Sequence, residues 1–178
     1  MQRLRQELEP VISCPGYSSN QLQELPYFSA VINEGLRLHG GVIWRSQRIA
    51  PEPLTFQEWV IPAGTPMSSS TYFTHYNETF FPNPRRFIPE RWLKTSENGH
   101  ESVKKYLVCF GKGSRSCLGY NLGTSMLFLT LAAVVTKFDM VPFETDDRDV
   151  EIQRDWSIPM GRPDTKGVRA MVVSKIIA

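Results

Sequence analysis

The sequence has few cysteines, and they follow no regular spacing. There are three, Cys14, Cys109 and Cys117, and no two of them form a CxxC pair. A disulfide framework needs an even set of cysteines, and a zinc site needs clustered Cys and His ligands, a spacing that the three histidines do not complete. We therefore expect free thiols in a reducing compartment and no zinc site.

The chain also lacks long runs of like charge. Lys and Arg number 20 and Asp and Glu 18, which gives a net charge of +2. A nucleic-acid-binding domain concentrates basic residues on one face or along one helix, so we expect no nucleic-acid partner. Residues 1–15 mix charges throughout and lack the apolar centre of a signal peptide.

One long stretch without charge is present, at residues 118–136. Its length reaches that of a transmembrane helix. Its first half nevertheless contains glycines and polar residues, and only residues 126–135 are strongly apolar throughout. The pattern favours a helix that is buried on most sides of a large core over a membrane span.

The remaining pattern predicts a fold that is mainly α with small β-sheets. Hydrophobic residues make up 41% of the chain and charged residues 21%, as is typical of a globular domain or a large part of one. Pro26 separates two helical regions, and several prolines prevent a long helix between residues 71 and 92, where aromatic residues should pack an irregular segment. The predicted elements are helices at 1–13 and 22–39, short strands within 40–50 and 55–70 with a hairpin around Pro62, Ala63 and Gly64, and a terminal strand at 167–176.

The loop CFGKGSRSCLG places Cys117 just before the predicted helix. A helix N-terminus stabilises a thiolate, which is the form of cysteine that binds metals. Gly113 permits a tight turn, and Gly119 lets a flat group lie close to the backbone. Arg115 is suited to a carboxylate of the same ligand, and Phe110 is placed to shield the sulfur from water.

A flat cofactor that carries both a metal and carboxylates is heme, and a cysteine thiolate is one of its known axial ligands. We therefore predict that Cys117 is the iron ligand and the only metal-binding residue. Cys109 is expected to be a small core residue on a strand, because free cysteines pack as hydrophobic side chains.

The same loop carries a family resemblance. Phe110, Gly113, Arg115, Cys117 and Gly119 fit the signature F-x-x-G-x-R-x-C-x-G, and the stretch resembles the cysteine loop of the cytochrome P-450 heme-thiolate monooxygenases. The sequence also looks like family members from filamentous fungi, including trichodiene-oxygenase-like enzymes of secondary metabolism.

Two further motifs follow the order of the family. Glu34 and Arg37 form an E-x-x-R pair on one face of a predicted helix, and Arg91 lies in the Pro-Glu-Arg segment. An isolated pair of this kind usually lies on the surface. Together with the cysteine loop, the resemblance implies a buried Glu–Arg–Arg network that braces the loop.

The segment after the E-x-x-R helix departs from the family. Gly40 and Gly41 stand where the family commonly has two prolines, and glycine permits more backbone freedom. Residues 42–44 resemble a segment that lines the substrate pocket. The resemblance suggests Arg48 as the second partner of the heme propionates, with Arg45 as the alternative; one of the two would then simply face solvent.

The resemblance implies a monooxygenase that contains heme b and receives electrons from NADPH through a reductase. It would insert one oxygen atom into a small apolar substrate such as a terpenoid, polyketide or fatty acid. The chain contains no expected catalytic residue beyond the iron ligand. The alternative is a non-catalytic, truncated heme-binding remnant.

Residues 1–178 correspond to the C-terminal portion of a single domain of this family. The distal helix, the helices over the substrate and an N-terminal membrane anchor would all precede Met1. We therefore expect the complete protein on the cytosolic face of the endoplasmic reticulum membrane. We expect this portion by itself to be soluble, cytoplasmic and inactive.

Overall fold

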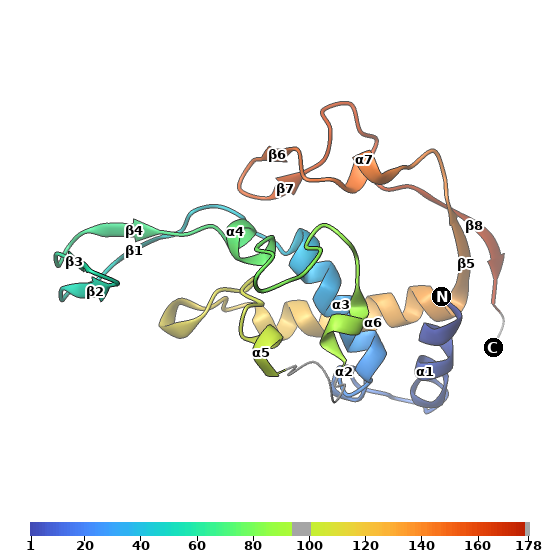
Figure 1. Cartoon of the computed structure of the whole chain (residues 1–178). Helices are drawn as coiled ribbons and strands as arrows, with labels where there is room; N and C mark the ends of the chain where they lie inside the picture. The colour runs from blue at the N-terminus through green and yellow to red at the C-terminus, as the bar shows by residue number, and fades with distance from the viewer. Residues whose placement is uncertain (94–100, 177–178) are drawn as a thin grey trace.

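The computed structural model describes residues 1–93 and 101–176, and it is mainly helical with small two-stranded sheets (Figure 1). The fold class is therefore the predicted one. Four helices form the main body: α1 (Gln2–Ile12), α2 (Ser19–Gln23), α3 (Pro26–His39) and α6 (Tyr120–Lys137). The shorter helices are α4 (Thr71–His75), α5 (Glu101–Lys104) and α7 (Asp147–Val150), with 3-10 turns η1 (Pro89–Trp92) and η2 (Gly113–Arg115).

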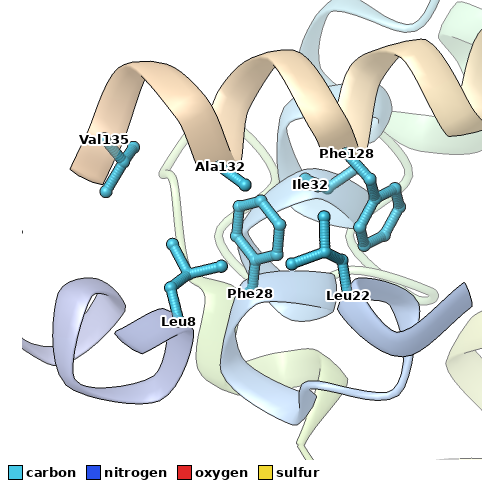
Figure 2. Packing of buried hydrophobic residues seen from close by; sticks show 7 residues of the cluster. All are labelled: Leu8, Leu22, Phe28, Ile32, Phe128, Ala132 and Val135. Carbon is cyan, nitrogen blue, oxygen red and sulfur yellow. The ribbon is translucent and has the colours of Figure 1, made fainter. Parts of the chain in front are cut away.

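The main core lies between α6 and the three N-terminal helices (Figure 2). Phe28 of α3 and Phe128 of α6 meet edge to face, with ring centroids 5.4 Å apart. Burial of such aromatic and aliphatic side chains supplies most of the energy that holds helices together. The buried members of this core are Leu8, Leu22, Phe28, Ile32, Phe128, Ala132 and Val135.

Helix α1 also holds its neighbours through two charged side chains. The Arg5 guanidinium donates to the carbonyl oxygens of Val135 and Phe138 at the end of α6, at 2.9 and 3.0 Å. The Glu7 carboxylate accepts hydrogen bonds from Tyr27 N and Phe28 N, at 2.9 and 2.7 Å. These contacts satisfy backbone groups that helix ends leave without partners.

Helix α6 is buried on one face rather than on most sides. Its buried residues are spaced at three or four positions, as one helical face requires: Thr124, Phe128, Ala132 and Val135. Leu122, Met126 and Leu129 are exposed. The expectation of burial on most sides is therefore wrong for the described chain, because its other helices cover only one face of α6. Among the described helices, none combines the length and hydropathy needed to cross a membrane.

Within the described residues, the strands form four antiparallel pairs. Strand β1 (Gln47–Ile49) pairs with β4 (Pro66–Ser68), and β2 (Leu54–Phe56) pairs with β3 (Trp59–Ile61). The β2–β3 hairpin therefore turns at residues 57–58, and the hairpin predicted around Pro62–Gly64 is wrong. Gln57 adopts φ 54° in this tight turn, whereas residues 62–65 form a turn that returns the chain to β1.

The C-terminal part of the chain forms the other two strand pairs. Strand β5 (Phe138–Pro142) pairs with β8 (Ala170–Lys175), so the predicted terminal strand is present. Strand β6 (Arg154–Asp155) pairs with β7 (Pro159–Met160). Residues 76–88 have no regular helix or strand, as the prolines predict, and Phe81 and Trp92 pack with Ala30 in a second, smaller core.

Candidate functional site

The cysteine loop is a compact turn with its thiol exposed. Gly111 and Gly113 adopt φ 68° and 76°, a region that glycine enters without strain. Cys117 N donates to the Phe110 carbonyl at 2.8 Å, which closes the loop across its base. The Cys117 side chain is solvent-accessible.

Cys117 lies three residues before helix α6, whose N-cap is Gly119. A Cβ atom at Gly119 would lie 3.8 Å from the Cys117 sulfur, so glycine leaves the space beside the thiol open. The positive end of the α6 dipole is close to this position. Phe110 packs edge to face against Tyr120, with centroids 5.0 Å apart.

One cavity brings the thiol together with two arginines. It has a volume of about 690 Å³, within the usual range of cofactor pockets, and both Arg48 and Arg115 line it with Cys117. Apolar walls come from Val42 and Trp44. Arg45 lies elsewhere: its guanidinium is over the Phe73 ring, 5.6 Å from the centroid, and it lines a different cavity.

These residues fit the predicted heme. The cavity provides an exposed thiol, two permanent cations and apolar side chains. Within residues 1–93 and 101–176, neither Arg48 nor Arg115 has a carboxylate within ion-pair distance. Both guanidinium groups are therefore available for carboxylates of a ligand.

The loop also borders a second cavity, of about 710 Å³, between α3 and α6. Cys109, Phe110, Gly111 and Cys117 line both cavities. The buried hydroxyl of Thr124 borders this space and has no hydrogen-bond partner among the described residues.

Glu34 and Arg37 form a buried ion pair on α3. The Arg37 Nε and Nη2 atoms donate to the two carboxylate oxygens of Glu34, both at 2.9 Å, and both side chains are fully buried. Arg91 of η1 adds a third charge, because its Nε donates to Glu34 at 3.1 Å. The structure thus brings these three predicted residues together.

Backbone and ring donors complete this cluster. Ile88 N and the Trp92 indole nitrogen each donate to Glu34 at 2.9 Å. Burial raises the pKa of Glu34, but hydrogen bonds from Arg37 and Ile88 and the charge of Arg37 offset burial and leave the pKa below its usual value. Glu34 is therefore ionised at neutral pH.

Arg37 connects the cluster to the segment at residues 75–86. Its guanidinium donates to the carbonyl oxygens of His75, Pro84 and Arg86, at 2.8, 2.7 and 3.2 Å. An arginine with this many acceptors fixes the path of a segment that has little regular structure of its own.

His75 is a residue that the sequence analysis missed. It is 2% exposed, and its Nε2 accepts a hydrogen bond from Val108 N at 3.0 Å. Burial and the nearby charge of Arg37 lower the pKa of His75 to about 4, so the ring is neutral. No metal-ligand spacing marked this histidine, because its partner is a backbone amide 33 residues away.

Cys109 lies in a turn, not on a strand, so the predicted strand position is wrong. Its side chain is half-buried, and burial raises the pKa of its thiol to about 11. A Cβ atom at Gly40 would lie 2.6 Å from the Cys109 Cβ and would also overlap the Leu36 carbonyl. Gly40 is therefore needed for close packing, whereas Gly41, at φ 67°, uses the backbone freedom of glycine.

Comparisons with known proteins agree on one family. The family model described as cytochrome P-450 matches residues 1–166. The chain is 39% identical over 173 residues to the cytochrome P-450 monooxygenase aflU of Aspergillus parasiticus, a match that covers 96% of this chain and 34% of that protein. It is 43% identical over 155 residues to the monooxygenase TRI4 of Trichoderma arundinaceum, covering 85% and 30%.

A solved structure is similar over nearly the same residues. Retinoic acid bound cyanobacterial CYP120A1 superposes with a TM-score of 0.74 at 25% identity, covering 97% of this chain and 38% of that one. The chain thus spans about a third of the length of the curated relatives it matches.

Proposed function

The chain belongs to the cytochrome P-450 family, and on that premise we propose that it forms the heme-thiolate portion of a monooxygenase. Residues 1–178 would be the C-terminal part of a single domain. The observation that carries the proposal is the single cavity that holds the Cys117 thiol together with Arg48 and Arg115.

Each residue of this cavity has a role in the proposal. The Cys117 thiolate would bind the iron, and Arg48 and Arg115 would pair with the two propionates. Heme with a thiolate ligand supplies oxygen activation, because the thiolate pushes electron density toward the iron and favours O–O cleavage. Gly119 places no Cβ atom in contact with the sulfur, and Val42 and Trp44 contribute apolar side chains to the wall of the cavity.

The Glu34–Arg37–Arg91 cluster has a supporting role. It would hold the segment at residues 75–91 against α3 and in this way support the cysteine loop. Groups that are locked by their own hydrogen bonds keep a binding site in one geometry. Arg45 has no role in this proposal, since it contacts Phe73 outside the cavity.

The substrate and partners follow from the same premise. We expect a small apolar substrate, of terpenoid, polyketide or fatty-acid type, and an NADPH-dependent reductase as electron donor. The relatives are monooxygenases from fungi, which supports a small-molecule substrate and an electron donor. We expect the complete protein at the endoplasmic reticulum membrane, facing the cytosol.

A second candidate is a non-catalytic heme-binding product. The observation that favours it is that residues 1–178 contain no candidate catalytic residue beyond the iron ligand, Cys117. The presence or absence of upstream coding sequence in frame with a distal helix would decide between the two candidates.

The test of the proposed iron ligand compares two cysteine variants of the complete heme-loaded protein. Cys117→Ala is expected to abolish the shifted Soret band of the reduced carbonyl complex, since that band requires a thiolate ligand. Cys109→Ala, which removes a thiol from the same cavity wall, should retain the band. Loss of the band in Cys109→Ala and its retention in Cys117→Ala would reverse the assignment.

A further inference from the structure

The turn that leads into the cysteine loop is held by one buried side chain from outside the loop. Val108 N donates to His75 Nε2 at 3.0 Å, and Gly111 N donates to the Val108 carbonyl at 2.9 Å. Phe110, inside this turn, accepts the hydrogen bond from Cys117 N at 2.8 Å. Two backbone hydrogen bonds, Gly111 N to the Val108 carbonyl and Cys117 N to the Phe110 carbonyl, therefore connect the residue that His75 holds to the backbone of Cys117.

His75 is itself held rigidly in place. Its carbonyl accepts from Arg37 Nη1 at 2.8 Å, and Arg37 is fully paired with Glu34. Its ring meets Phe81 edge to face, with centroids 6.3 Å apart and an interplanar angle of 87°. The ring is 2% exposed, so it has little freedom to change rotamer.

The protonation state of His75 follows from its partner. A backbone N–H is always a donor, so the Nε2 atom that faces it must be unprotonated. Burial and the charge of Arg37, which lower the pKa of the ring to about 4, maintain this neutral form at physiological pH. The acceptor is thus present under all conditions in which the protein would work.

The turn is also limited by packing at Cys109. Gly40, just after α3, leaves no room for a Cβ atom beside Cys109. The turn therefore has a hydrogen bond to His75 at Val108 and a close contact with Gly40 at Cys109.

We propose that His75 is a positioning residue for the Cys117 thiolate. Its Nε2 fixes the Val108 backbone, and the turn at 108–111 transmits that position to Cys117 through Phe110. The inference rests on the proposed function, in which the Cys117 sulfur binds the heme iron.

The experiment uses the complete heme-loaded protein with three substitutions. His75→Phe keeps an aromatic ring against Phe81 but removes the acceptor. His75→Gln places an amide oxygen near the position of Nε2 and should restore the hydrogen bond. The matched control is Tyr76→Phe at the residue that follows α4. It removes a different hydrogen bond, from the Tyr76 hydroxyl to the Leu38 carbonyl at 3.0 Å.

Two measurements are made on each variant. The first is the fraction of the reduced carbonyl complex that shows the thiolate-type Soret band. The second is amide hydrogen exchange across residues 107–111. His75→Phe should lose about half or more of the thiolate-type band and exchange about tenfold faster in this segment, since one buried hydrogen bond is lost. His75→Gln and Tyr76→Phe should match the wild type in both.

The outcomes separate this inference from the proposed function. A wild type without the thiolate-type band would contradict the proposed function itself. A wild type with the band, together with a folded His75→Phe variant that keeps it, would overturn the positioning role. If His75→Phe does not fold, His75→Asn replaces it, because the Asn side chain is too short to reach Val108 N. If His75→Asn then shows the same thiolate-type band and the same amide exchange as His75→Gln, the inference is rejected.

Discussion

At the residue scale, Glu34 is a buried carboxylate whose charge is stabilised by its hydrogen-bond partners. It is fully buried and accepts hydrogen bonds from Arg37, Ile88, Arg91 and Trp92. A buried ion pair offers little net stability compared with an apolar pair, but removal of one partner leaves an uncompensated charge in the interior. The cluster is therefore costly to break even though it is not the main source of stability.

Glu34→Ala is expected to lower the free energy of unfolding by about 3–5 kcal/mol. The matched control is Glu90→Ala, which removes a carboxylate from the exposed pair with Arg3, 3.7 Å apart, and should cost about 0–1 kcal/mol. Thermal or denaturant unfolding of the complete protein measures both. Equal midpoints for the two variants would show that Glu34 does not act as a buried charge.

At the element scale, helix α3 depends on α1 for its N-terminal cap. Its N-cap residue, Leu25, has no side-chain hydrogen bond to offer, and Pro26 follows at the first helical position. Glu7 supplies the missing acceptors from another helix, and its negative charge lies at the positive end of the α3 dipole. The orientation of α3, and with it the position of Glu34 and Arg37, is thus linked to α1.

Glu7→Ala should destabilise the protein by about 0.5–2 kcal/mol, as the loss of a helix N-cap usually does. Amide exchange at Tyr27 and Phe28 should rise, because these two N–H groups lose their acceptor. Glu9→Ala, an exposed position on the same helix, is the control and should change neither quantity. Unchanged exchange at Tyr27 and Phe28 in Glu7→Ala would argue against the capping role.

At the scale of the whole molecule, the described chain leaves apolar surface uncovered after the cysteine and along α6. Leu118, which follows the cysteine, is fully exposed, and Leu122 and Met126 of α6 are exposed as well. Apolar surface of this kind normally contacts another part of a protein or a partner. The residue after Cys117 and the outer face of α6 therefore need further atoms to cover them.

We predict that the 178-residue chain by itself does not sustain monooxygenation. A heme with one face uncovered loses apolar burial at about 25 cal/mol per Å² and is open to water, whereas oxygen chemistry needs a site from which water is excluded. The assay supplies heme, a reductase and NADPH, and measures product from a panel of terpenes and fatty acids. The complete protein is the positive control, and coupled turnover by the isolated chain at a comparable rate would contradict the prediction.

The sequence by itself determined the features that depend on neighbouring residues. The cysteine loop is one continuous stretch, so the spacing of Gly113, Arg115, Cys117 and Gly119 is readable directly. Glu34 and Arg37 are three residues apart on a helix, which places them on one face whatever the rest of the fold. Pro26 marks a helix start because its fixed φ suits the first helical turn.

The tertiary structure decided what depends on residues far apart in the chain. It selected Arg48 rather than Arg45 to line the cavity with Cys117, placed Cys109 in a turn, and closed the hairpin at residues 57–58. It also joined His75 to Val108 across 33 positions. The spacing of residues along the chain does not predict such contacts. They depend on how α3, α4 and the cysteine loop pack against one another.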